Sequence, residues 1–123
     1  MRTRNITVNG TEYVINRAVS VDIAIEARGM KVTDLNDKTR VSTQLILALL
    51  HEMMVAGAKW ARLNGQKDAP EPPSEEKLAD MLDQDDLTAL IPPMMEVIMG
   101  VRNVQAKPTK KAKAGESGES PAR

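Results

Sequence analysis

The residues that could do chemistry are few in this chain. His51 is the one histidine and cysteine is absent, so disulfides, thiolate metal sites and cysteine nucleophiles are excluded. His51 and Glu52 begin like the zinc-binding pattern H-E-x-x-H, but Val55 stands where the second histidine would be. We therefore expect His51 to be a partly exposed helical residue, and we expect no catalytic residue, no metal and no cofactor.

Two charged clusters could bind ions or nucleic acid. Asp83, Asp85 and Asp86 resemble part of a calcium-binding loop, but the glycine and the bidentate glutamate that such a loop needs are missing. Helix capping is the favoured interpretation of these residues. Lysines near the C-terminus could contact nucleic acid nonspecifically, although a solubilising tail is favoured; they are Lys107, Lys110, Lys111 and Lys113.

The composition allows one domain with an aliphatic core. Of the 123 residues, 41% are hydrophobic, yet there is one Trp, one Tyr and no Phe beside 8 Met. Base-stacking nucleic-acid modules are therefore disfavoured, because they need several aromatic side chains on one surface. No apolar run approaches the roughly 20 residues that a membrane span requires, and no secretory signal is visible. We expect a cytoplasmic protein without a membrane partner.

Charge is spread unevenly along the chain, although the formal net charge is zero. Residues 1–65 carry nine Lys or Arg against six Asp or Glu, residues 66–91 carry two against eight, and residues 105–123 carry five against two. An acidic band between two basic zones suits protein partners or self-association better than DNA. The alternative interpretation is that these charges form solvated faces.

The first predicted element is a β-hairpin over residues 4–16. Asn9-Gly10 favours a two-residue turn, which would place Ile6 opposite Tyr13 and give the hairpin one apolar face. A lone hairpin is only marginally stable in water. This hairpin must therefore pack on helices or extend a sheet across subunits.

Two helices are predicted next in the chain. A short helix over 20–28 would be capped by Ser20 and would stop at Gly29. A connector over 30–37 would lead to a long helix over 38–64, whose apolar residues cover more than one face. Such a helix is either a central core helix or partly a contact with another subunit.

A glycine and a proline-rich loop mark the next stretch. Gly57 costs about 1 kcal/mol relative to alanine inside a helix, so it would serve the close approach of a neighbour, or a bend. A loop over 65–73 follows the long helix, and Ser74 would then cap a helix over 74–83.

The last predicted helix covers 86–103 and would be capped by Asp85. Pro92-Pro93 should divide it into two pieces that meet at a kink, because proline removes a backbone donor and clashes with the preceding turn. The sequence therefore predicts a mainly α fold with a small N-terminal β-hairpin (α+β) and about four helices. A single domain would span 1–104, followed by a disordered tail over 105–123 that lacks large apolar side chains.

The order of these elements and a few short segments carry a family resemblance. The hairpin reads I-T-V-N-G-T-E-Y-V-I, the long helix ends in K-W-A-R-L-N-G, and S-E-E-K-L-A-D-M-L-D leads into D-D-L-T-A-L-I-P-P-M-M-E-V-I. Over roughly residues 5–104 this arrangement resembles the tail assembly chaperones of long-tailed bacteriophages and prophages. Within that family it resembles the short product of the tail chaperone gene. Pro92-Pro93 departs from what the family would lead one to expect.

The resemblance implies a function in virion assembly without catalysis. Members of the family associate with the tape measure protein, assist assembly of the major tail tube protein around it, and leave before the virion is complete. The resemblance also implies self-association into oligomers and a location in the host bacterial cytoplasm. Many members are made in two lengths by a programmed frameshift, for which the lysine-rich segment after Ala106 offers a place.

A Met-rich segment near the C-terminus is the predicted binding site for amphipathic helices of the tape measure protein, because methionine repacks easily against varied apolar sequences. Its predicted residues are Trp60, Leu87, Leu90, Met94, Met95 and Ile98, with an acidic rim of Asp80, Asp83, Asp85 and Asp86. The alternative is that these apolar side chains close the protein's own core. The alternative function is that of a small helical regulatory or DNA-associated protein with a basic tail, while a small enzyme is disfavoured.

Overall fold

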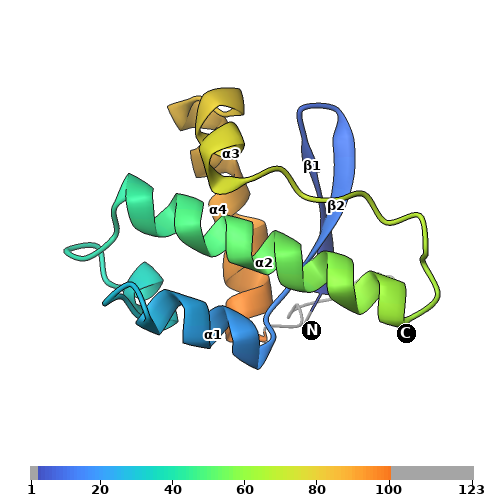
Figure 1. Ribbon diagram of the computed structural model, residues 1–123. Helices are drawn as coiled ribbons and strands as arrows, with labels where there is room; N and C mark the ends of the chain where they lie inside the picture. The colour runs from blue at the N-terminus through green and yellow to red at the C-terminus, as the bar shows by residue number, and fades with distance from the viewer. Residues whose placement is uncertain (1–2, 101–123) are drawn as a thin grey trace, which may run out of the picture.

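A two-stranded antiparallel hairpin followed by four α-helices forms the fold, as the sequence predicts (Figure 1). The computed structural model describes residues 3–100, so the predicted tail lies outside the described residues. The elements in chain order are β1 (Thr3–Val8), β2 (Thr11–Asn16), α1 (Val19–Glu26), the 3₁₀ helix η1 (Val32–Asn36), α2 (Thr43–Leu63), α3 (Glu75–Met81) and α4 (Gln84–Met99).

The hairpin has the predicted register and faces. Asn9 and Gly10 form the turn with φ of 50° and 82°, values that a two-residue turn of this kind requires. Ile6 pairs with Tyr13, and Val8 pairs with Thr11. The inward-facing side chains Ile6, Val8, Tyr13 and Ile15 are buried, and Asn5, Thr7 and Glu12 on the other face stay exposed.

Helix α2 is the central element, and the other elements pack around it. It begins at Thr43 rather than at residue 38, because the Ser42 hydroxyl caps it by accepting a hydrogen bond from the Leu45 N–H at 3.1 Å. Most of its apolar circumference is covered by the chain itself, with Leu49, Leu50 and Met53 fully buried. The core-helix interpretation of this segment is therefore the one that the structure supports.

Gly57 lets the hairpin backbone lie directly on α2. A Cβ atom at this position would be 1.8 Å from the Val14 carbonyl oxygen and 2.9 Å from the Ile15 Cα. Of the two roles that the sequence suggested for Gly57, close approach is confirmed. The hairpin is thus fixed on α2 by backbone contact as well as by its buried side chains.

The segment between the hairpin and α2 differs from the prediction in three respects. Helix α1 begins at Val19 after Ala18, whose side chain makes no cap, and Ser20 lies exposed within the first turn. Regular helix stops at Glu26, and looser turns continue to Gly29, which has a φ of 77°. The predicted connector contains η1, because two of its side chains, Val32 and Leu35, are buried in the core.

Helices α3 and α4 form a corner near the N-terminal end of α2, where Gln84 donates a hydrogen bond to the Thr43 hydroxyl at 3.4 Å. Ser74 caps α3 as predicted, with its hydroxyl accepting from the Lys77 N–H at 3.2 Å. Helix α4 starts earlier than predicted, because Asp83 rather than Asp85 is its cap: Asp83 and Asp86 satisfy each other's backbone N–H groups at 2.8 and 3.2 Å.

Helix α4 is one continuous helix, so the predicted division into two pieces at Pro92-Pro93 is wrong. The carbonyl groups that lose their partners to the two prolines belong to Thr88 and Ala89 by helical spacing. Both residues are exposed, so water can satisfy these groups and the helix need not break. It ends at Gly100, which is left-handed with a φ of 65°.

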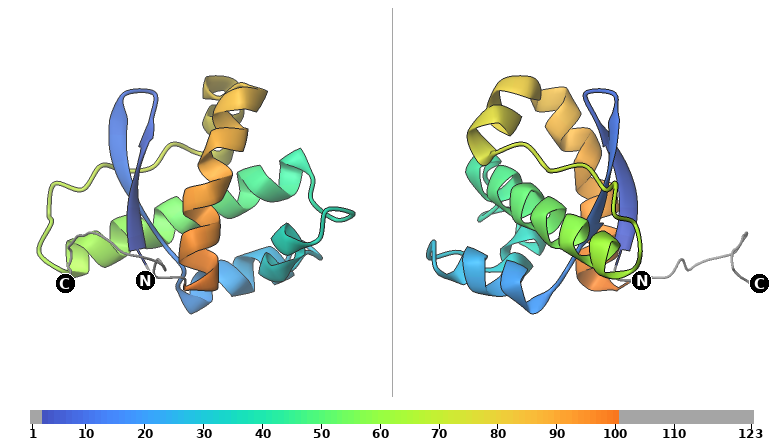
Figure 2. Two further views of the ribbon diagram at one scale, coloured as in Figure 1. Left: turned by 180° about the vertical axis from the view of Figure 1, so that it is seen from behind. Right: turned by 45° about the vertical axis from the view of Figure 1, so that its right-hand side comes forward.

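The hairpin and α4 lie side by side over one side of α2, while α1 and α3 flank it at opposite edges (Figure 2). Arg4 of β1 forms an ion pair with Glu96 of α4. Within residues 3–100, no helix is both long and apolar enough to cross a membrane. Side chains from all of the elements meet in one hydrophobic core.

Candidate functional site

The predicted Met-rich segment of α4 turns out to face mainly inward. Leu87, Leu90, Met94 and Ile98 are buried in the chain's own core, and Met94 has no exposed surface at all. The alternative interpretation, that these side chains close the core, therefore describes these four residues. Met95 is half-buried and packs at the edge of the core.

Trp60 does not join the α4 residues with which the sequence grouped it. It lies near the C-terminal end of α2, whereas α4 crosses α2 nearer the middle (Figure 2). Its side chain is half-buried and lies outside the hydrophobic core cluster, and its carbonyl accepts a hydrogen bond from the Asn64 side chain at 2.8 Å. The structure thus separates Trp60 from the segment containing Met94.

The predicted acidic rim is exposed, and most of its residues stabilise the start of α4. Asp83 and Asp86 form the capping box of α4, and Asp85 stands in its first turn, where the helix dipole favours negative charge. Asp80 is exposed on α3. Capping thus accounts for Asp83 and Asp86 as the sequence suggested, and within residues 3–100 no acidic or histidine cluster could hold a metal ion.

The exposed large apolar side chains gather elsewhere. Val19 and Ile23 of α1 are 75% and 62% exposed, and Met99 at the end of α4 is 56% exposed. Val19, Ile23 and Ala27 are spaced four residues apart and so share one side of the helix, while Val21 and Ile25 on the opposite side are fully buried. We call the exposed set Val19, Ile23, Ala27 and Met99 the α1 surface.

Arg17 fixes the geometry of the α1 surface. Its guanidinium donates to the Ile98 carbonyl oxygen at 2.6 Å and to both oxygens of Asp22 at 3.1 and 3.2 Å. The start of α1 is thereby tied to the end of α4, which brings Met99 to the same end of the molecule as Val19.

A charged cluster holds α3 against α1 and α2. The Arg28 guanidinium lies 2.8 Å from a carboxylate oxygen of Glu75 and 3.4 Å from one of Glu52, and His51 Nδ1 is 3.6 Å from Glu52. The hydrogen bond from Arg28 lowers the pKa of Glu75 below its ordinary value, and the same bond raises the pKa of Arg28. The cluster works as an ionic clamp between these helices.

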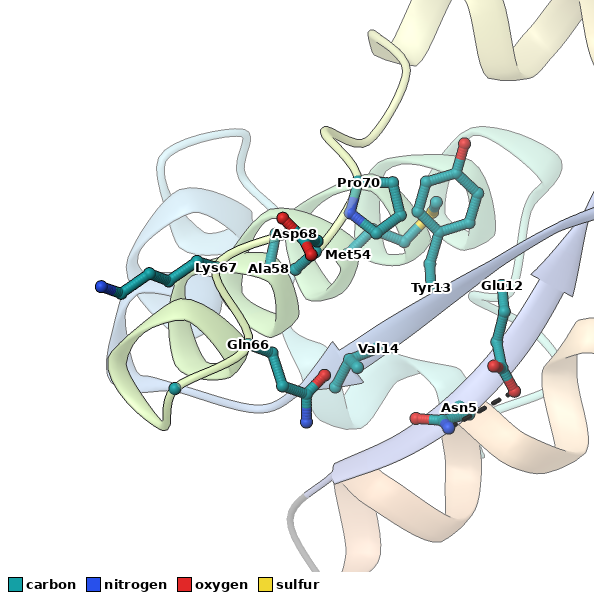
Figure 3. Close-up of a pocket in the computed structure, with 12 residues that line it drawn as sticks. Asn5, Glu12, Tyr13, Val14, Met54, Ala58, Gln66, Lys67, Asp68 and Pro70 are labelled. Atoms are coloured by element: carbon teal, nitrogen blue, oxygen red, sulfur yellow. Dashed lines mark hydrogen bonds between the residues drawn. The ribbon is translucent and has the colours of Figure 1, made fainter.

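A cavity of about 390 Å³ opens between the hairpin, α2 and the loop after α2 (Figure 3). Its floor includes Met54 and Ala58 of α2, and the ring of Tyr13 stands beside Pro70 of the loop. Glu12 lines the cavity from the hairpin and accepts a long hydrogen bond of 3.4 Å from the Asn5 amide. The cavity has an apolar floor and a polar mouth.

The α1 surface does not follow from apolar periodicity on a single side of α1. The segment V-S-V-D-I-A-I places apolar residues at both i, i+4 pairs, 19/23 and 21/25, which lie on opposite sides of a helix. That double stripe is a usable signal, since a surface helix normally has one. The predicted nucleic-acid contact by the basic tail lies outside the described residues.

No family model, no curated protein and no solved structure matches the chain.

Proposed function

We propose that this protein is a non-catalytic tail assembly chaperone of a long-tailed bacteriophage, which holds amphipathic helices of the tape measure protein on the α1 surface. The observation that carries the proposal is the exposed apolar side of α1 opposite its buried side. Val19 and Ile23 remain exposed, although most of the other large apolar side chains within residues 3–100, including nearly all of those of α2, are covered. An apolar strip that the fold does not use is typical of a site for another protein.

The surroundings of the α1 surface suit a helical partner. Two side chains at i, i+4 spacing form a ridge that packs into the groove of a second helix. Glu26 next to the strip is exposed and Asp22 is paired with Arg17, so a basic residue flanking the partner's apolar face would meet a carboxylate at Glu26. The α1 surface takes the place of Met94 and its neighbours, which the sequence predicted as the binding site for the tape measure protein.

The other parts of the proposal come from the family resemblance. Self-association into oligomers, contact with the major tail tube protein, absence from the finished virion and action in the host bacterial cytoplasm belong to the same proposed function. The apolar circumference of α2 does not favour self-association, because the chain covers that helix itself. Leu63, which is 86% exposed at the end of α2, and the α1 surface are the apolar places that remain for contacts between copies.

Co-expression with the tape measure protein of the same phage tests the proposal. The double variant Val19→Glu, Ile23→Glu should fold, because both side chains are exposed, and it should leave the tape measure protein largely in the insoluble fraction. The control is Ser20→Glu, which adds one glutamate at an exposed polar position of the same helix. Circular dichroism establishes that both variants are folded. Equal protection by the double variant and the control would contradict the proposal.

A further inference from the structure

The hairpin carries unpaired backbone groups on the outer edge of β2. The two-residue turn makes Val8 and Thr11 a hydrogen-bonded pair, and hydrogen-bonded pairs alternate with non-bonded ones along an antiparallel ladder. Thr7–Glu12 and Asn5–Val14 are therefore non-bonded pairs. The N–H and C=O groups of Glu12 and Val14 consequently point away from β1.

One end of this edge is covered and the other is open. The Val14 carbonyl oxygen lies against Gly57 of α2, which agrees with its outward direction. The backbone groups of Glu12 have no hydrogen-bond partner within residues 3–100 beyond the hairpin. Glu12 borders the 390 Å³ cavity, across which lies the loop that contains Gln66 and Pro70 (Figure 3).

We propose that the edge of β2 at Glu12 is a strand-addition site for an extended peptide that carries a basic residue between two apolar residues. An unpaired strand edge selects an extended backbone, because only an extended segment can exchange both N–H···O=C bonds with it. In antiparallel pairing one residue of the peptide exchanges both bonds with Glu12. The cavity beside the edge supplies the room that the added segment needs.

The side chains around the edge specify the sequence of the peptide. The residue opposite Glu12 places its side chain on the outer face, next to a carboxylate that no described cation pairs with, so a lysine or arginine fits there. The residues before and after it point to the inner face, toward Tyr13 and Met54 at the cavity floor. Apolar side chains fit those two positions.

This site is independent of the proposed chaperone function. It lies on the hairpin and the loop after α2, whereas the α1 surface involves neither of these segments. Loss of tape measure protection in the α1 variants and loss of peptide binding at β2 are therefore separate results, and either one can fail without the other.

The probe is the blocked pentapeptide acetyl-Thr-Val-Lys-Val-Thr-amide, titrated into the isotope-labelled full chain and followed by NMR. Saturable shifts of the backbone amides of Glu12 and Val14, together with Gln66, are expected. The same peptide with a methyl group on the backbone nitrogen of its lysine keeps all of its side chains, but that nitrogen cannot donate a hydrogen bond to the Glu12 carbonyl. It should bind about tenfold more weakly.

A charge swap provides the matched control. Replacing the peptide lysine by glutamate should weaken binding to the natural chain several-fold, and Glu12→Lys, an exposed position, should reverse that preference. The proposal is overturned if the Glu12 and Val14 amides do not shift, if the N-methyl peptide binds equally well, or if the swap leaves the preference unchanged.

The proposal is also overturned if the Glu12 amide of the free chain is already protected from hydrogen exchange. Protection independent of concentration would identify a segment of this chain as occupant, and protection that rises with concentration would identify a second copy.

Discussion

At the scale of single residues, a few side chains occupy positions where one atom decides the packing. Gly57 is the clearest, because an extra methyl group would overlap the Val14 carbonyl oxygen. Met94 is another, because it is fully buried between α4 and the rest of the core, whereas its neighbour Met95 reaches the edge. At Gly57 the fold requires the absence of a side chain, and at Met94 it requires an apolar one.

Gly57→Ala should lower the free energy of unfolding by roughly 2–4 kcal/mol, although alanine is the better helix former. The reason is the 1.8 Å approach of the added Cβ to the Val14 carbonyl oxygen, which would force the hairpin away from α2. Urea unfolding followed by circular dichroism measures the loss. Gly65→Ala is the control: its Cβ would meet nothing within 4 Å, and only its φ of 97° opposes the change, so a loss of about 1–2 kcal/mol is expected. Equal losses for both variants would mean that the contact at Gly57 is not tight.

Met94→Asp should unfold the protein, because it buries an unpaired carboxylate where no side-chain surface is exposed. Met95→Asp should remain folded with a smaller loss of stability, because the half-buried Met95 side chain lets a carboxylate reach water. Thermal melts by circular dichroism distinguish the two. A folded Met94→Asp variant would indicate that residue 94 lies at the surface, and it would contradict the buried position of Met94 in the core.

At the scale of the elements, caps and clamps decide where helices begin and what they hold. Helix α4 begins at a reciprocal capping box, and α3 is short, with Leu78 as its one fully buried side chain. A helix of 7 residues is not stable by itself. Its position therefore depends on Leu78, on the Ser74 cap and on the ionic clamp between Glu75 and Arg28.

Asp83→Ala should cost about 1 kcal/mol of stability, because it leaves the Asp86 N–H without its partner. Asp85→Ala removes a charge from the same turn but no capping bond, so a loss of about 0.3 kcal/mol is expected from the helix dipole alone. Urea unfolding of the two variants side by side checks the difference. The reverse order would show that α4 is capped at Asp85, as the sequence alone had indicated.

Glu75→Gln should cost roughly 0.5–1 kcal/mol near neutral pH, a small value because Glu75 and Arg28 are 30% and 33% exposed. The pKa of Glu75 is lowered in the folded protein, so its contribution is complete above the ordinary value of 4.5 and is lost as the pH falls through the lower, folded value. The difference between Glu75→Gln and the natural chain should therefore shrink as the pH falls below 4.5 and vanish at the low pH where Glu75 is protonated in the folded protein. Glu76→Gln, an exposed neighbour in the same turn, should show little effect at either pH.

At the scale of the whole molecule, the hairpin, α1, α2, α3 and α4 share one hydrophobic core, so the described part should unfold as one unit. Trp60 provides a local probe at the end of α2, while circular dichroism reports all of the helices. The two transitions should coincide in urea. A separate fluorescence transition would mean that the end of α2 and the loop beside the hairpin open independently.

Much of this fold could be predicted from local patterns. The hairpin register follows from Asn9-Gly10 and a period of two, and the Ser74 cap follows from its position before two glutamates. The continuity of α4 through Pro92 could not be predicted, because it depends on whether the carbonyl groups of Thr88 and Ala89 face water. That exposure is a tertiary property of the fold.

The candidate site was harder to predict than the fold. Periodicity identifies Met94 and Ile23 alike as apolar positions on helices, and it does not say which of them another element will cover. The distinction came from the crossing of α4 over α2, which hides one side of α4, and from the peripheral position of α1, which leaves one side of it uncovered. The length of α2 was overestimated for the same reason, since an apolar residue such as Val41 packs on the core without being helical.

The ion pair between Arg4 and Glu96 has a consequence for how the chain folds during synthesis. Because the two partners are 92 positions apart in the sequence, β1 can make its contact with α4 only after nearly all of residues 3–100 have been synthesised. The inner side of the hairpin likewise waits for α2. Such non-local contacts raise the contact order and slow folding relative to a bundle of similar size whose helices pair with their sequence neighbours. A nascent chain stopped before α4 should therefore expose the apolar side chains that α4 covers, and should itself be a client for the host's chaperones.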